Sequence, residues 1–477
     1  MTNSKRILLA LVAVEITLIA IRVIGRSVLP LYDDAFITFR YARNFASGAG
    51  LVYHPNEWVL GLTGPLYSLV VSVFYLLSLP IWHAVTGMNI AFDAITLFIT
   101  FLILAKGREP LAAVLFGLFF AVSPIMTRIC AGGMEANLFL LCSVVSIFLY
   151  HRGAKKAAIM LAAASYYLRP EAALLVAVLL ATEVISHRKK PSERYRAVWL
   201  TLLALVVVVP PLFLLYRYYG HILPQSVLAK TGRSSSLAYV IKNLLIPDPQ
   251  CFVLLPLAIW GFVGVMKQEG FVRTYAIWGI AYLLAYLAGR PDMWSWYGAP
   301  VHYALFVLAA AGCARLLRRL LERELPPQWI AAAGGICATA TWLLVLAIAG
   351  RSAVTTYLYE PLDLWCRQDG NLEHSSILAS DIGAVGYFSN ARIYDTAGLV
   401  WPQALSISSA REIIETRHPD YVFLNRTASN MEMMDGEPLR KSYRLTETFL
   451  VPNNVCTIFK FKKEWIQEYM IFEKVGE

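Results

Sequence analysis

The sequence predicts a polytopic α-helical membrane protein with a small α/β domain at its C-terminal end. Three observations lead to this prediction. The 477 residues are 58% hydrophobic and only 16% charged, whereas a soluble protein has about a quarter charged residues. The apolar residues come in runs of about 16–22, which as helices cross about 30 Å of hydrocarbon. After residue 351 this pattern stops, and short apolar segments alternate with turn residues.

Twelve apolar segments in the first 350 residues are candidates for membrane-spanning helices. We expect helices because the segments are too long and too uniformly apolar to be the strands of a membrane barrel. In chain order they are 7–29, 64–82, 88–105, 110–127, 135–150, 155–168, 171–186, 197–216, 251–266, 271–288, 298–314 and 328–350.

The positive charges predict the orientation of these helices. The net charge is +10, and much of the basic excess lies in short loops. Cytoplasmic loops of membrane proteins are enriched in Lys and Arg in this way. The basic loops are 151–156, 187–196, 267–273 and 315–327. With the N-terminus inside and the segment after residue 350 outside, the number of crossings must be odd. We therefore predict about eleven transmembrane helices, with one irregular segment between residues 64 and 127. No basic stretch is interleaved with aromatic residues in a soluble module, which argues against nucleic-acid binding.

The last part of the chain has the pattern of a small α/β domain. Segments with strand character alternate with a helical pattern at 409–418; these segments are 375–381, 391–396, 420–425 and 455–463. No glycine-rich phosphate-binding signature precedes a helix here. We predict a transmembrane catalytic module and an extracytoplasmic domain, with these bounds: 1–350, with external loops 30–63 and 217–250, and 351–477.

The first external loop carries a high density of charge directly after the first apolar segment. Its apolar residues recur near helical spacing over 33–47, which predicts an amphipathic helix at the membrane surface. Asp33 and Asp34 begin this helix. One carboxylate can take a proton from an acceptor hydroxyl, and the other can bind a hydroxyl or a cation. The alternative is that the two acids cap the helix and complement its dipole.

Three further charged residues of this loop are candidates for binding. Arg40 and Arg43 are three residues apart and share a helix face, and their geometry suits a lipid phosphate. Attraction to anionic head groups is the alternative for both. Glu57 is a candidate contact for the acceptor or the sugar.

Ionisable residues at the ends of apolar segments are also candidates, because charge at membrane depth is costly. Arg169 is a candidate ligand of the donor phosphate, and Glu135 and Glu171 are candidate acceptor or sugar contacts. An ion pair between Arg169 and Glu171 at the start of a helix is the alternative.

The later external loops add cations and aromatic residues. Candidates for holding the phosphate as it leaves are Lys230, Arg233 and Arg290. Candidate acceptor or sugar contacts are Asp292, Trp294 and His302. For Trp294 the alternative is an interfacial aromatic belt, and His302 equally fits a hydrogen-bonded position in the core.

Several motifs, in the same order along the chain, resemble blocks of the bacterial GT-C glycosyltransferases. They are DDAFITFRYARNFASGAGLVYHPNEWVLGLTGPLYSLV, GGMEANLFLL, LRPEAALL, LPQSVLAKTG, GRPDMW, SDIGAVGYFS and IYDTAGLVWPQAL. The resemblance is to the group that contains the mycobacterial terminal arabinofuranosyltransferases. It implies an integral-membrane, inverting enzyme that uses a polyprenyl-monophosphate sugar donor. It also implies a first-loop aspartate as general base, which falls on Asp33 and Asp34.

One position departs from the pattern of that group. The stretch VLGLTGPLY has Leu60 where the group has a carboxylate. The departure bears on which sugar is moved and what accepts it, and leaves the class of enzyme unchanged.

The sequence thus predicts a multi-pass glycosyltransferase of the bacterial inner (plasma) membrane, with a cytoplasmic N-terminus. It would move a sugar from a polyprenyl-phosphate donor to a hydroxyl of a cell-envelope glycan or lipid, by single displacement with inversion. A metal is not required, since a phosphate is a fair leaving group, although a divalent cation is compatible with the two acids. The alternatives are a transporter or flippase of lipid-linked sugars, for which inverted repeats are expected, and a non-catalytic subunit of an envelope-assembly complex.

Overall fold

The computed structural model describes most of the chain. The predicted strand at 455–463 lies outside the described residues. These are 3–107, 109–186, 191–229, 234–245, 250–267, 269–321, 326–349, 353–368, 372–407, 409–427, 430, 442–452 and 466–475.

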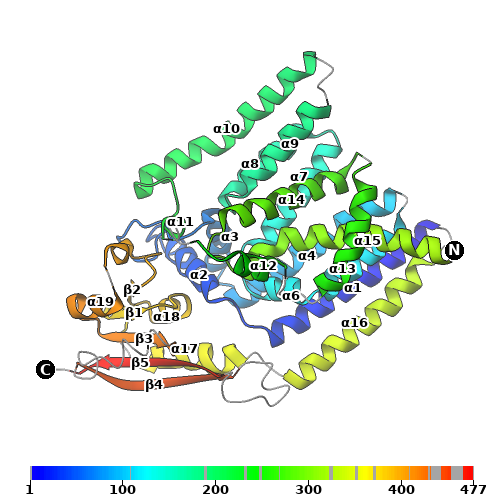
Figure 1. The fold of residues 1–477 in the computed structure, drawn as a ribbon. Helices are drawn as coiled ribbons and strands as arrows, with labels where there is room; N and C mark the ends of the chain where they lie inside the picture. The colour runs from blue at the N-terminus through cyan, green and yellow to red at the C-terminus, as the bar shows by residue number, and fades with distance from the viewer. Residues whose placement is uncertain are drawn as a thin grey trace. The chain divides into compact units, whose positions relative to one another are not determined.

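Each predicted apolar segment overlaps a helix (Figure 1). The corresponding helices are α1 (Asn3–Val28), α3 (Pro65–Leu76), α4 (Ile81–Lys106), α5 (Pro110–Val122) with α6 (Pro124–Ala131), α7 (Ala136–His151), α8 (Lys155–Ala164), α9 (Ala172–Ser186), α10 (Pro191–Tyr219), α13 (Gln250–Val265), α14 (Phe271–Gly289), α15 (Ala299–Leu321) and α16 (Pro327–Ala349). Further helices in this part of the chain are α2 (Asp33–Ala46), α11 (Gln225–Leu228) and α12 (Leu237–Leu245).

The helices confirm a multi-pass membrane protein. Within the described residues, five are long and apolar enough to cross a membrane, or up to seven if each bent pair is one span. The count of eleven stays a prediction. Two irregular features fall between residues 64 and 127, where the sequence predicts one. Helix α3 has 12 residues, about 18 Å of helix, which is shorter than the hydrocarbon core. Helices α5 and α6 meet at a bend of 58°.

The chain forms two compact units. The first contains residues 1–26, 85–214 and 232–344, and the second contains residues 27–84, 215–231 and 345–477. The first external loop and the C-terminal segment therefore belong to the same unit, although they come from opposite ends of the chain. The division at residue 350 that the sequence suggests stays a prediction.

A buried ion pair organises the bend in the first unit. Arg22 Nε of α1 lies 2.7 Å from Asp93 Oδ2 of α4, and both side chains are fully buried. The same guanidinium donates to the carbonyl oxygens of Phe120 and Ala121 near the end of α5, each at 2.9 Å. These carbonyls belong to the last turn of a helix and need an outside partner, so one cation serves both the ion pair and the bend.

The second unit contains a mixed five-stranded sheet in the order β2-β1-β3-β5-β4 (Figure 1, orange and red). Strand β1 is parallel to β2 and β3, while β5 is antiparallel to β3 and β4. The strands are β1 (Ser376–Ala379), β2 (Arg392–Asp395), β3 (Tyr421–Asn425), β4 (Tyr443–Pro452) and β5 (Ile466–Lys474). The helices of this region are α17 (Glu360–Gln368), α18 (Gly383–Ser389) and α19 (Ala410–Arg417).

This sheet confirms the predicted α/β domain. The predicted strands at 375–381, 391–396 and 420–425 correspond to β1, β2 and β3, and the predicted helix at 409–418 is α19. Apolar side chains of the strands pack against this helix in one core, which includes Leu378, Val422, Leu424, Ile413 and Ile414. The core holds the parallel strands in register and so positions their carboxyl ends.

Candidate active site

Asp33 joins the N-terminal ends of α2 and α18. Its Oδ2 accepts the N–H of Gly383 and its Oδ1 accepts the N–H of Ala384, each at 2.8 Å. Its own helix has Tyr32 as N-cap, without a side-chain cap. The capping role that the sequence suggests therefore exists, but it serves α18. Gly383 is required here, because a Cβ at this position would lie 1.9 Å from the carbonyl oxygen of Asp33.

Arg40 and Arg43 bind the other end of α18. Arg40 donates to the carbonyl oxygens of Gly386 and Ala391, each at 2.8 Å, and Arg43 donates to that of Tyr387 at 3.0 Å. An acid at the N-terminal end and cations at the C-terminal end both complement the helix dipole. We call these contacts of Asp33, Arg40 and Arg43 the α18 clamp. Phosphate binding by the two arginines stays a prediction, and Arg40 is only 1% exposed.

A short stretch after α2 packs against the edge strand β2. His54 Nε2 accepts the backbone N–H of Ile393 at 2.9 Å. Burial lowers the pKa of His54, which keeps this nitrogen unprotonated and able to accept. Glu57 lies 2.7 Å from Arg392 and 3.4 Å from His54 Nδ1. Its hydrogen bond with His54 lowers the pKa of Glu57, so the predicted acceptor contact is a carboxylate that already has two partners.

The carboxyl ends of the parallel strands add a third acid to the first-loop pair. Asp381 follows β1 and accepts a hydrogen bond from Asn425, the last residue of β3, at 2.9 Å. It lies two residues before Gly383, whose N–H binds Asp33. We call Asp33, Asp34 and Asp381 the acidic cluster; all three are partly buried. Ligand sites in open α/β sheets lie at such strand ends.

The acidic cluster changes the protonation of Asp33. Burial and the neighbouring charges of Asp381 and Asp34 raise the pKa of Asp33 to about 7, while the N–H groups of Ala384 and Gly383 oppose this shift. Burial also raises the pKa of Asp381. A carboxyl group that exchanges its proton near neutral pH suits general acid–base chemistry.

We expect Asp381→Asn to move the pH profile of any activity that uses Asp33 as a base. If Asp33 acts as a base, activity falls as the pH drops through about 7, where Asp33 becomes protonated. Removing the Asp381 charge lowers this pKa, so the acid limb of kcat/KM moves to lower pH. Asp363→Asn is the control, because it also removes one carboxylate charge, but Asp363 pairs with Arg367 on α17 and is not part of the acidic cluster. An unchanged acid limb in Asp381→Asn would contradict the coupling.

In the first unit, Arg169 lies between two glutamates. Its Nη1 is 3.0 Å from Glu135 Oε1 and its Nη2 is 2.9 Å from Glu171 Oε1, which confirms the alternative of an Arg169–Glu171 ion pair. Tyr286 also donates to Glu171, and the ring of Tyr297 lies 4.1 Å from the guanidinium carbon. Functional roles for these charged residues stay predictions.

The loop before α15 places two more candidates. Asp292 accepts a hydrogen bond from Tyr239 at 3.0 Å. Trp294 stacks on Trp296 with ring centroids 6.0 Å apart, and it is 52% exposed. An exposed indole fits both a sugar contact and an interfacial belt, so the two interpretations of Trp294 stay open.

The remaining candidates are a buried histidine, an exposed arginine and two residues that are not described. His302 is fully buried, and its Nδ1 lies 2.8 Å from a backbone carbonyl oxygen, which matches the core position given as its alternative. The backbone of Arg290 adopts the left-handed helical conformation, with φ of 43°. The Arg290 carbonyl oxygen accepts the N–H of Ser235. Lys230 and Arg233 lie outside the described residues.

Leu60, the position where a carboxylate is expected from the resemblance, is a packing residue. It is 4% exposed, and its carbonyl accepts the N–H of Gln225 at 2.7 Å. The first loop and the start of the second external loop are therefore joined through backbone here. A carboxylate at this position would have to be buried.

Sequence reasoning missed Asp381. The predicted strand 375–381 ends on Asp381, and an acid at the carboxyl end of a parallel strand is a recognised position for a site. What the sequence did not show is that a residue from the first loop would lie at the same strand end.

Comparison with known proteins gives the fold. The crystal structure of ArnT from Cupriavidus metallidurans bound to undecaprenyl phosphate matches with a TM-score of 0.61 and 14% identity, over 98% of this chain and 97% of that chain. Its apo state matches with a TM-score of 0.62 and 14% identity, over 96% of this chain and 97% of that one. The Archaeoglobus fulgidus oligosaccharyltransferase in complex with Zn and sulfate matches with a TM-score of 0.55 and 13% identity, over 92% of this chain and 71% of that chain.

The chain has the GT-C fold. ArnT and the oligosaccharyltransferase are GT-C glycosyltransferases, and the predicted fold class is thereby confirmed. In addition, a family model described as a domain of unknown function (DUF8728) matches residues 358–469. Comparison with curated protein sequences finds no match. The more specific resemblance to the mycobacterial arabinofuranosyltransferases stays a prediction.

Among the described residues, no three His, Cys, Asp or Glu side chains are grouped so that they could hold a metal ion.

Proposed function

We propose that this protein is a membrane glycosyltransferase that moves a sugar from a polyprenyl-phosphate donor to an acceptor hydroxyl, with inversion. The observation that carries the proposal is the acidic cluster, which joins two acids of the first-loop helix α2 to Asp381 at the end of β1, in a chain with the fold of ArnT. ArnT was solved with undecaprenyl phosphate, which supports a donor of that class here. A cell-envelope glycan or lipid is the proposed acceptor.

Asp33 is the proposed general base. Its two backbone hydrogen bonds hold the carboxylate in one orientation, and each oxygen keeps a lone pair for a hydroxyl proton. The acceptor oxygen then attacks the anomeric carbon, and the bond from that carbon to the phosphate oxygen breaks. The polyprenyl phosphate leaves as an anion, and Asp33 keeps the proton. Asp34 is proposed to bind the acceptor hydroxyl.

The predicted phosphate ligands and sugar contacts belong to the same proposal. Cations stabilise a leaving phosphate electrostatically. The proposed phosphate ligands are Arg40, Arg43, Arg169, Lys230, Arg233 and Arg290. The proposed acceptor or sugar contacts are Glu57, Glu135, Glu171, Asp292, Trp294 and His302.

Purified protein and labelled polyprenyl-phosphate sugars test the proposal. We expect one polyprenyl phosphate to be released for each sugar transferred to a hydroxyl acceptor, with inverted anomeric configuration by NMR. A matched reaction with a nucleotide sugar should give no product. In sealed vesicles, movement of the intact lipid-linked sugar without release of polyprenyl phosphate would instead identify a transporter.

A reporter fusion tests the proposed orientation. The N-terminus is proposed to be cytoplasmic and the sheet domain extracytoplasmic. Alkaline phosphatase fused after residue 353 should therefore be active, because this reporter folds only outside the cytoplasm, and a fusion within the basic loop 151–156 should be inactive. The reverse pattern would overturn the orientation while leaving the fold intact.

A further inference from the structure

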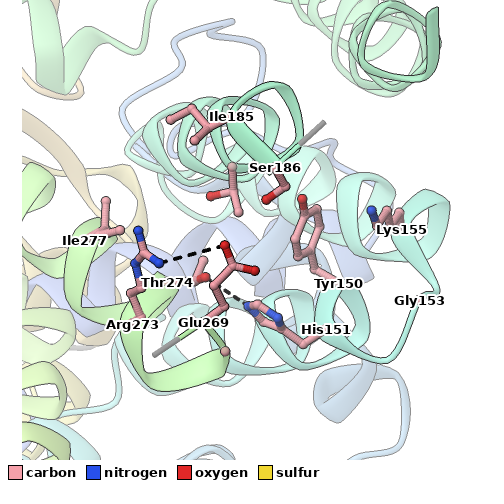
Figure 2. Close-up of a pocket in the computed structure, with 12 residues that line it drawn as sticks. Tyr150, His151, Gly153, Lys155, Ile185, Ser186, Glu269, Arg273, Thr274 and Ile277 are labelled. Carbon is pink, nitrogen blue, oxygen red and sulfur yellow. Dashed lines mark hydrogen bonds and ion pairs between the residues drawn. The ribbon is translucent and has the colours of Figure 1, made fainter. Parts of the chain in front are cut away.

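A polar cavity in the first unit lies apart from every residue assigned above. It has a volume of about 470 Å³ and is lined by residues of α7, α8, α9, α14 and the turn before α14. Figure 2 shows its side chains, with Arg273 and Glu269 facing each other and His151 directed toward Thr274. Two loops that the sequence marks as basic, 151–156 and 267–273, contribute to its wall.

Two residues that line the cavity, Tyr150 and Lys155, contact a buried acid behind its wall. Glu183 is 1% exposed and lies 2.6 Å from Lys155 Nζ. It also accepts the Tyr150 hydroxyl at 2.8 Å and contacts Arg196. Within the described residues Lys155 is therefore a lining cation that shares its acid with a second cation, Arg196.

Of the two cations that line the cavity, Arg273 and Lys155, Arg273 lies farther from its acidic partner. Its guanidinium lies 4.0 Å from Glu269, whose side chain is 81% exposed, while that of Arg273 is 34% exposed. An exposed pair of this kind on one helix end contributes little. Two oxygens of one phosphate at the cavity would accept two parallel hydrogen bonds from the planar guanidinium, and the phosphate would be the stronger partner.

The rim of the cavity is apolar on one side. Ile185 lines the cavity and is 62% exposed, next to Val184 at 53%, and Ile277 of α14 also lines it (Figure 2). In a membrane protein, exposed aliphatic side chains of a helix end contact acyl chains. The hydroxyls of Thr274 and Ser186 also line the cavity. A free anion would leave the aliphatic rim unused.

We propose that this cavity binds an anionic phospholipid. The phosphate contacts Arg273 and Lys155, the polar part of the head group contacts the hydroxyls, and the first methylenes of an acyl chain lie on Ile185. Basic pockets between membrane helices recognise anionic head groups in this way. The proposal is independent of the glycosyltransferase assignment, since no residue of the acidic cluster or the α18 clamp takes part.

Lipid retention tests the proposal on the whole chain. The protein is exchanged into bilayer discs of equal parts phosphatidylglycerol and phosphatidylcholine, released into mild detergent, and its bound lipids are counted by native mass spectrometry. We expect phosphatidylglycerol to be retained at least tenfold more than phosphatidylcholine. Arg273→Gln should remove this preference. Arg318→Gln is the matched control, because Arg318 is also a half-exposed arginine paired with an exposed glutamate, Glu109.

Glu269→Gln gives a second, opposite test. It removes the carboxylate that competes for Arg273, so retention of phosphatidylglycerol should rise above that of wild type. Millimolar inorganic phosphate should displace at most part of the lipid, because it cannot use the aliphatic rim. Equal retention of the two lipids, an unchanged preference in Arg273→Gln, or complete displacement by inorganic phosphate would each overturn the proposal.

Discussion

Asp33→Asn should lower kcat/KM for sugar transfer by about 10²–10⁴-fold, the usual contribution of a general base. The amide has no basic oxygen to take the acceptor proton. It also turns an NH₂ group toward the N–H of Gly383 or Ala384, where two acceptors are needed. The measurement is the initial rate of transfer from a polyprenyl-phosphate sugar, with insertion into the membrane monitored separately.

A matched carboxylate separates catalysis from structure in this experiment. Asp420 also accepts hydrogen bonds at the start of a structural element, from the N–H and hydroxyl of Ser376, but it lies away from the acidic cluster. Asp420→Asn should keep transfer within a few-fold of wild type. Asp34→Asn should show a smaller loss than Asp33→Asn. Full activity in both Asp33→Asn and Asp34→Asn would overturn the assignment of the base to the first loop.

Gly383→Ala should break the α18 clamp without changing any charge. The added methyl group would lie 1.9 Å from the carbonyl oxygen of Asp33, so either α2 or α18 must move. Overpacking of this kind costs about 1–3 kcal/mol of stability. Displacing the base by about 1 Å can lower the rate by about 10²-fold. The measurements are the unfolding temperature in detergent and the transfer rate.

Another glycine of the chain provides the control for Gly383→Ala. At Gly87, inside α4, an added methyl group meets no atom within 4 Å. Gly87→Ala should leave transfer unchanged and stabilise the helix by up to about 1 kcal/mol. If Gly383→Ala retained both the wild-type unfolding temperature and the wild-type rate, the close approach of α2 and α18 would be wrong.

Much of the candidate site was predictable from residue type and position, but its partners were not. The acids Asp33 and Asp34 stand out because charge is rare beside apolar segments. The roles of Arg40 and Arg43 in the α18 clamp could not be predicted, because their partners are backbone carbonyls more than three hundred residues away. A backbone carbonyl has no residue-type signal in a sequence.

The sequence by itself determined most of the helices and the first three strands of this protein, but it did not predict β4 or β5. Apolar runs specify helices through their length, and alternating short segments specify β1, β2 and β3, because these patterns depend only on neighbouring residues. The bounds of α3 are an exception, because the predicted segment 64–82 contains both α3, which ends at Leu76, and the start of α4 at Ile81.

Only the tertiary structure decided what the charged residues contact. It placed Asp381 beside Asp33, paired Arg169 with two glutamates, and gave Leu60 a packing role. Each of these depends on which distant segments meet and on how much water they exclude. Burial and a neighbouring charge are what raise the pKa of Asp33 to about 7, and both arise only when the first loop and the C-terminal sheet fold into one unit.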